Sequence, residues 1–124
     1  MAELAVIALC LAPAPVVLSV LTWSVVRSNA RPGARPSDWL GMRTAATKAS
    51  PEAWVRGHCA ALPASRTTMR IGLVSVGAVL ALVLASLVAP HVAVLALGTS
   101  VAAVLVVTGG CVHACVVADR AARG

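Results

Sequence analysis

Two long stretches of this chain contain no Asp, Glu, Lys or Arg. The first covers residues 4–26, and the second covers residues 71–118, where His91 and His113 are the only side chains that can carry a positive charge. A helix needs about 20 apolar residues to cross the hydrocarbon core of a bilayer, so the first stretch fits one span and the second fits two. Proline ends a helix, and Pro90 divides the second stretch into two spans of membrane length. The two stretches therefore predict an all-α membrane protein with three transmembrane helices.

These lengths assign residues 1–26 to the first helix, 71–89 to the second and 92–118 to the third, with residues 119–124 as a short tail. No Lys or Arg precedes the first apolar run, which is also longer than the apolar part of a signal peptide, so a retained helix is favoured over a cleaved signal. Pro13 and Pro15 lie inside it. We expect them to kink the helix toward its neighbours or a wet cavity, although prolines are also simply tolerated in membrane helices.

The charged residues give the chain an orientation. The chain is 60% apolar and only 11% charged, which is too little charge for the surface of one soluble domain. All ten Lys and Arg residues lie in the connection 27–70 or in the tail, and three spans place these two regions on the same side. The positive-inside rule makes that side the cytoplasm, with the N-terminus outside. The net charge of +6 comes from dispersed arginines, which suit anionic lipid headgroups better than nucleic acid.

No catalytic or metal-binding constellation is visible. The spans hold no acidic residue, and the chain has neither a Ser/His/Asp arrangement nor a nucleotide motif, so we expect no enzyme activity and no cofactor. The four cysteines do not form a disulfide framework, because most lie within apolar spans. Residues two apart on a helix point in different directions, so His113 faces away from the Cys111 and Cys115 pair and no metal site is expected.

Small side chains recur every four residues in the second and third predicted helices. The two stripes are Gly77, Ala81 and Ala85, and Gly110, Ala114 and Ala118. Such stripes let helix backbones approach closely in lipid, but they also arise by chance in a chain rich in Ala and Val. They favour pairing of the two helices and leave open an oligomer or a membrane protein partner.

The connection contains the start signal of a further helix. Ser50 suits the N-cap, Pro51 the first helical position and Glu52 the first turn, and Pro63 is expected to end the helix after about residue 62. Trp54, His58, Ala61 and Leu62 would share one face of this helix, with Glu52 and Arg56 near the other. We therefore expect a short amphipathic helix over about residues 51–62, lying flat at the inner membrane interface.

The pattern Gly41-x-Arg43-Thr44, with Thr47, Glu52, Trp54 and His58 after it, resembles the signature of the SdpI family of small bacterial membrane proteins. The motif covers about residues 37–62, and the three-span layout also agrees. Three features differ: Ser37 or Asp38 stands where an Asn is often found, Ala45 stands where a Pro often follows, and the founding member is longer, with extra spans. The resemblance implies a multi-pass protein of the bacterial cytoplasmic membrane.

The resemblance further implies a role like that of the founding member: immunity to a secreted peptide toxin that attacks the membrane, coupled to holding a cognate repressor at the membrane. Arg43 and Thr44 would then form an anion site at the headgroup level, with Glu52 paired to Arg43 or Arg56. A purely structural interpretation has Gly41 making a turn and Arg43 snorkelling or pairing with Glu52. For Trp54 an interfacial anchor is the favoured role. A small accessory or structural subunit of a larger membrane complex is the alternative function.

Overall fold

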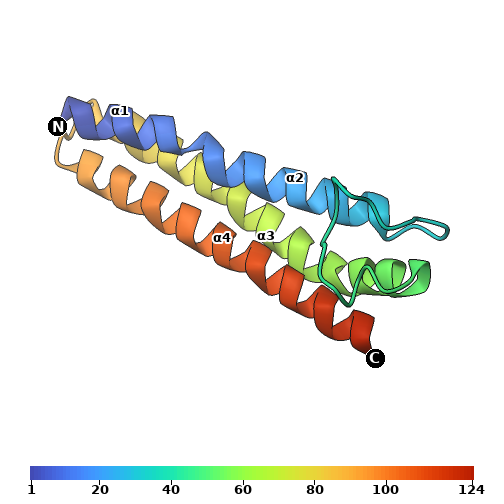
Figure 1. Cartoon of the computed structure of the whole chain (residues 1–124). Helices are drawn as coiled ribbons and strands as arrows, with labels where there is room; N and C mark the ends of the chain where they lie inside the picture. The colour runs from blue at the N-terminus through green and yellow to red at the C-terminus, as the bar shows by residue number, and fades with distance from the viewer.

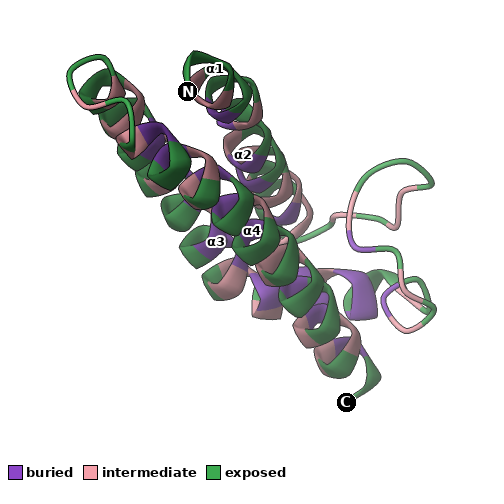
Figure 2. Ribbon diagram, turned by 90° about the vertical axis from the view of Figure 1, so that its left-hand side faces the viewer, coloured by how far each residue is buried: buried purple, intermediate pink, exposed green.

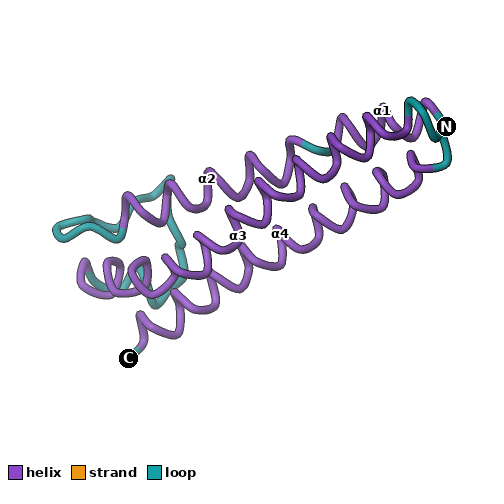
Figure 3. The backbone as a smooth tube through the Cα atoms, turned by 180° about the vertical axis from the view of Figure 1, so that it is seen from behind, coloured by secondary structure: helices purple, strands orange, loops and turns teal.

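The computed structural model describes residues 1–124 and contains four α-helices and no strand (Figure 3). Helices α1 (Ala2–Leu11) and α2 (Pro13–Asn29) follow one another along a single rod, and α3 (Pro51–Ser86) and α4 (Val92–Arg123) form two more rods. The three rods lie side by side, with the N-terminus and the α3–α4 turn at one end and the C-terminus and the connection 30–50 at the other (Figure 1). Each rod is long and apolar enough to cross a membrane, as the sequence predicted.

The prolines of the first rod interrupt it only briefly. Ala12 between α1 and α2 keeps helical dihedral angles, and its amide donates a hydrogen bond to the carbonyl of Ala8 at 3.0 Å. Pro15 is buried against the other helices, whereas Pro13 faces outward. The prolines therefore interrupt the backbone hydrogen bonds of the helix, but the rod remains packed against its neighbours.

The start of α3 differs from the expectation. Instead of a short interfacial helix ending at Pro63, one helix of 36 residues runs from Pro51 to Ser86. At about 1.5 Å per residue it is about 54 Å long, well beyond the hydrocarbon thickness of about 30 Å. Pro63 is exposed, and a buried stripe continues in register on the opposite side of the helix: Trp54, His58, Ala61, Ser65, Thr68 and Gly72. Packing of this stripe on both sides of Pro63 keeps the helix continuous where the local rule predicted its end.

Small side chains bring the helices close together. α3 packs most extensively on α4, and next on α2. A Cβ on Gly72 of α3 would collide with the Ser19 side chain of α2, and one on Gly110 of α4 would collide with Thr68 of α3. Ala114 and Ala118 are fully buried, so the predicted α4 stripe lies at an interface. The other predicted stripe does not.

The stripe Gly77, Ala81 and Ala85 is exposed, and nothing lies within 4 Å of the position of a Gly77 Cβ. Large apolar side chains are exposed on all three rods, as expected for surfaces that face lipid, while the buried positions line the centre of the bundle (Figure 2). α4 also continues past residue 118 to Arg123, so the predicted tail is mostly helical. A pair between Arg123 and Asp119, at 2.8 Å and i, i+4 spacing, supports this last turn.

Candidate functional site

Most of the motif residues meet at the loop end of the bundle, where the connection 30–50 folds back along the helices (Figure 1). The buried members are Thr47 from the connection and Trp54 and His58 from the first turns of α3, all at 0% exposure. We call this arrangement, with Gly41 and Met42, the latch. It packs on the end of α2 and on α4 through Met42, whose side chain lies with Val26, Ala61, Ala114 and Ala118.

Gly41 occupies a position that no other residue fits. Its φ is +111°, in the left-handed region that glycine adopts readily. A Cβ at this position would lie 2.5 Å from Cζ2 of Trp54 and 2.9 Å from Nε2 of His58. The missing side chain of Gly41 therefore lets the connection touch the aromatic pair of α3 directly.

His58 ties the connection to α3 through both ring nitrogens. Its Nε2 accepts a hydrogen bond from the amide of Met42 at 2.9 Å, and its Nδ1 lies 2.8 Å from the carbonyl oxygen of Trp54. Because a carbonyl only accepts, Nδ1 must carry the proton and the ring must be neutral. The apolar run of α3 begins only at Ile71, so His58 lies outside the membrane-spanning segment. Burial lowers its pKa, and the bond to the Trp54 carbonyl opposes that shift only in part.

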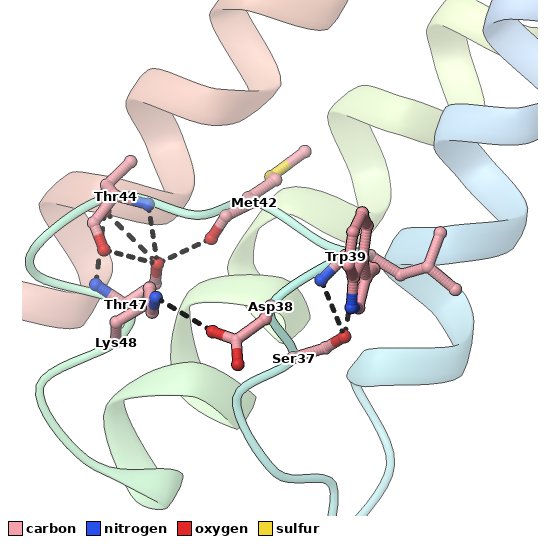
Figure 4. Close-up of polar contacts among 8 residues, drawn as sticks. Ser37, Asp38, Trp39, Met42, Thr44, Thr47 and Lys48 are labelled. Carbon is pink, nitrogen blue, oxygen red and sulfur yellow. Dashed lines mark hydrogen bonds and ion pairs between the residues drawn. The ribbon is translucent and has the colours of Figure 1, made fainter.

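Thr47 fixes the other side of Met42. Its hydroxyl donates to the carbonyl of Met42 at 2.5 Å and accepts from the amide of Thr44 at 3.0 Å (Figure 4). The Thr44 hydroxyl in turn accepts from the amide of Thr47 at 3.1 Å. Both backbone polar groups of Met42 are thus held by side chains, which is what a buried loop segment without secondary structure requires.

Trp54 is part of the protein interior rather than an anchor at the membrane interface, and the favoured expectation for it was wrong. Its indole Nε1 donates to Oδ1 of Asn29 at 3.1 Å, and Nδ2 of Asn29 donates to the Val25 carbonyl at 2.8 Å. The ring also packs against His58, with 4.4 Å between centroids. Asn29, the last residue of α2, is the hydrogen-bond partner of the indole. The sequence did not reveal this partner, because the long connection separates the two residues along the chain.

The structure does not assemble the expected anion site of Arg43 and Thr44. The Thr44 hydroxyl serves the turn with Thr47, while Arg43 is exposed and forms neither a hydrogen bond nor an ion pair. Thr44 also lies near Asp119 of α4, and its hydroxyl is the largest single cause that lowers the pKa of that carboxyl, followed by the hydrogen bond from Arg123. The guanidinium group of Arg43 is therefore the free cationic group of the motif.

Glu52 does not form the expected ion pair with Arg43 or Arg56. Glu52 is exposed, and its pKa is lowered first by its own backbone amide, then by the Ser50 hydroxyl, with a smaller contribution from Arg56. Ser50 caps the helix by accepting from the amide of Ala53 at 3.0 Å. Arg56 instead donates two hydrogen bonds of 2.9 Å to the carbonyls of Ala121 and Ala122. Arg56 thus supplies donors to two of the last carbonyls of α4, a role that sequence reasoning missed.

Beside the latch, the connection presents an exposed turn. Trp39 is 90% exposed and Leu40 59%, and the Ser37 hydroxyl accepts from both of their amides at 3.2 Å (Figure 4). Lys48 pairs with Asp38 at 3.4 Å across the same turn. We call Trp39, Leu40 and Arg43 the exposed edge. They stand on the backbone that leads into the buried latch, where the Met42 amide donates to His58.

The site contains no metal-binding group of His, Cys, Asp or Glu side chains, and the four cysteines are free thiols. Cys111 lies 3.4 Å from the Thr22 hydroxyl of α2, and Cys59 donates to the Ala30 carbonyl at 3.2 Å.

Comparison with known proteins gives one match. A family model described as the SdpI/YfhL protein family matches residues 34–117, which include the exposed edge, the latch, the whole of α3 and most of α4. No curated protein and no solved structure matches the chain. The family match covers well over half of the 124 residues, on a helical framework with three helices that can cross a membrane. The chain is therefore a membrane protein that belongs to the SdpI/YfhL family.

Proposed function

We propose that this protein confers immunity to a membrane-active peptide toxin and signals its presence to a regulator, as the resemblance to the founding member of the family implies. The observation that carries the proposal is the exposed edge: an indole, a leucine and an unpaired guanidinium beside the bundle, next to a turn in which the Ser37 hydroxyl accepts from two backbone amides. Aromatic and Arg side chains on a rigid support are typical anchors of protein interfaces. The partner they suit is a peptide or protein segment with an apolar and an acidic group.

Deletion of the gene followed by challenge with membrane-active peptides tests this role. The deletion strain is expected to become sensitive, and the wild-type chain to restore resistance. Arg43→Gln and Trp39→Ala are expected to lose protection while the protein still accumulates in the membrane, because neither side chain is buried. Arg31→Gln, another exposed arginine of the same connection, is the matched control and should protect fully. Unchanged sensitivity after deletion, across the peptides tried, would refute the immunity role.

We further infer that the exposed edge and the C-terminus face the cytoplasm of a bacterial cell. The inference rests on the placement of all ten Lys and Arg residues at one end of the bundle or in the connection beside it. Cys59 is exposed at that end and can report the orientation. In a variant with the other three cysteines changed to Ala, an impermeant thiol reagent should label Cys59 only after the cells are opened. Labelling of intact cells would reverse the orientation.

A second candidate, a subunit of a larger membrane complex, is favoured by the outward-facing small residues Gly77, Ala81 and Ala85. Mild-detergent purification should then recover a partner that Ala81→Leu releases. A change at exposed Gly98 of α4, where nothing lies within 4 Å of a Cβ, is the control. Retention of the same partner by Ala81→Leu would contradict this assignment.

A further inference from the structure

An open groove lies between α2 and α3 near the loop end of the bundle. Its volume is about 600 Å³, and it is lined by Trp23, Arg27, Leu62, Pro63, Arg66 and Thr67. Two arginines from different helices thus share one groove with an indole and a hydroxyl. No motif residue lies in it, so the groove is distinct from the latch and from the exposed edge.

The two arginines have no counter-charge in the protein. The only ion pairs join Lys48 to Asp38 and Arg123 to Asp119. Of the remaining acidic residues, Glu3 lies at the opposite end of the bundle, and Glu52 sits at the start of α3 near Arg56. None of the four carboxylates therefore lies in the groove. Its positive charge calls for an anion from outside the chain.

The groove lies at the border between the uncharged stretches and the charged end of the bundle. Arg27 follows directly after the uncharged stretch that ends at Val26, and Arg66 precedes by about one and a half helical turns the stretch that begins at Ile71. α2 and α3 run in opposite directions, so both arginines stand at the same border between apolar and charged surface. Membrane-interface arginines at this level meet the headgroup region of the bilayer.

The side chains around the arginines suit a phospholipid. The Arg27 guanidinium lies over the Trp23 ring, 5.0 Å from its centroid, which restricts the rotamers of Arg27 and leaves its edge free to donate. Guanidinium groups bind phosphate oxygens through paired donors. Leu62 and Pro63 give the groove an apolar wall for the glycerol and upper acyl carbons. The Thr67 hydroxyl gives its proton to the Pro63 carbonyl at 3.0 Å, so the two guanidinium groups, and not Thr67, are the donors for a phosphate.

We propose that the Arg27–Arg66 groove is a binding site for one anionic phospholipid, whose phosphate the two guanidinium groups hold between α2 and α3. This site does not depend on the proposed immunity role, because it uses none of the same residues. A bound lipid bridges the first rod and the α3–α4 hairpin at the end where the latch also joins them. The site therefore predicts that anionic lipid stabilises the association of α2 with α3.

The full chain, purified in a neutral detergent, tests the site by native mass spectrometry. Titration with phosphatidylglycerol should give one retained lipid per chain, and phosphatidylcholine at the same concentration should bind more weakly. Arg27→Gln and Arg66→Gln should each weaken phosphatidylglycerol binding by about fivefold, the effect expected of one basic residue at the membrane surface. Arg66→Lys keeps the charge without the forked donors and should fall between Arg66→Gln and the wild type.

Matched controls separate this site from diffuse attraction. Arg31→Gln and Arg120→Gln remove the same charge from exposed positions outside the groove and should leave lipid binding unchanged. Equal weakening by these controls would overturn the proposal, as would equal binding of the two lipids. A competition with inorganic phosphate tests the source of the anion. If phosphate at the lipid concentration displaces the lipid, the groove is an ion site and the lipid proposal fails.

Discussion

Replacement of Gly41 by Ala tests whether the latch is built as the structure shows. Two costs add at this position. The first is backbone strain, because a residue with a Cβ at a φ of +111° costs about 1–3 kcal/mol. The second is steric: the new methyl group would lie 2.5 Å from Trp54 Cζ2 and 2.6 Å from Cη2, and overpacking of this kind costs about 1–3 kcal/mol. We expect Gly41→Ala to destabilise the closed latch by about 2–6 kcal/mol.

The amide of Met42 reports this opening directly, because it is held by Nε2 of His58. Hydrogen exchange at a protected amide follows the free energy of local opening, and 2 kcal/mol corresponds to about a 30-fold change. Exchange of the Met42 amide in detergent micelles, measured by NMR, should therefore become at least about 30-fold faster in Gly41→Ala. Amides in the middle of α4 should exchange as in the wild type, because the bundle does not depend on the latch for its central packing.

Gly33 provides the matched control for the steric part. Its φ is +83°, and no atom lies within 4 Å of the position of its Cβ, so Gly33→Ala carries backbone strain alone. That strain should cost about 1–2 kcal/mol and should stay confined to the turn at residues 31–34. If Gly33→Ala accelerated Met42 exchange as much as Gly41→Ala, strain in the connection alone would explain the effect, and its assignment to the contact of Gly41 with Trp54 and His58 would be refuted.

Three further predictions concern the latch and the C-terminal end of α4. Acidification should open it: the pKa of folded His58 lies below its usual 6.5, so the latch is fully stable above pH 6.5 and loses up to about 1.4 kcal/mol per pH unit below it, until the folded pKa is reached. Exchange of the Met42 amide, corrected for its intrinsic pH dependence, should show this loss of stability. If the loss disappeared when His91 was replaced, the assignment to His58 would be contradicted. Trp54→Phe should cost about 1 kcal/mol in detergent unfolding, because Oδ1 of Asn29 loses its donor; a neutral result would mean that water replaces the indole. Arg56→Gln should accelerate amide exchange in the last turn of α4, since two hydrogen bonds to its carbonyls are lost, whereas exposed Arg120→Gln should not.

The membrane helices were predictable because the bilayer imposes a simple rule. A span must be apolar over its whole length, so uncharged stretches locate the spans without knowledge of any contact. The helix start at Pro51 was equally readable, since Ser50 caps it by a local hydrogen bond. The expectation that this helix ends at Pro63 was wrong. A local rule predicted a break, and tertiary packing of Ala61, Ser65 and Thr68 on either side of the proline overrode it.

The partners of the motif could not be read from the chain in the same way. Trp54 at a helix surface near the membrane is commonly an interfacial anchor, and only the position of Asn29 at the end of α2 shows that its indole is buried and paired. The role of Gly41 as a turn was visible, but its close approach to His58 depends on how far the connection folds back. Such distances between segments arise from the packing of the whole bundle.

The latch also decides which substitutions can reveal function. Gly41, Thr47, Trp54 and His58 serve to hold Met42 and the backbone beside it, so a change at any of them disturbs the fold before it disturbs recognition. Loss of protection in Trp54→Ala would therefore be expected whatever the protein binds. Arg43 and Trp39 are exposed and carry no latch contact through their side chains, so their substitution leaves the framework intact. Most motif residues thus serve the internal framework, and substitution of the two exposed side chains is the test of function.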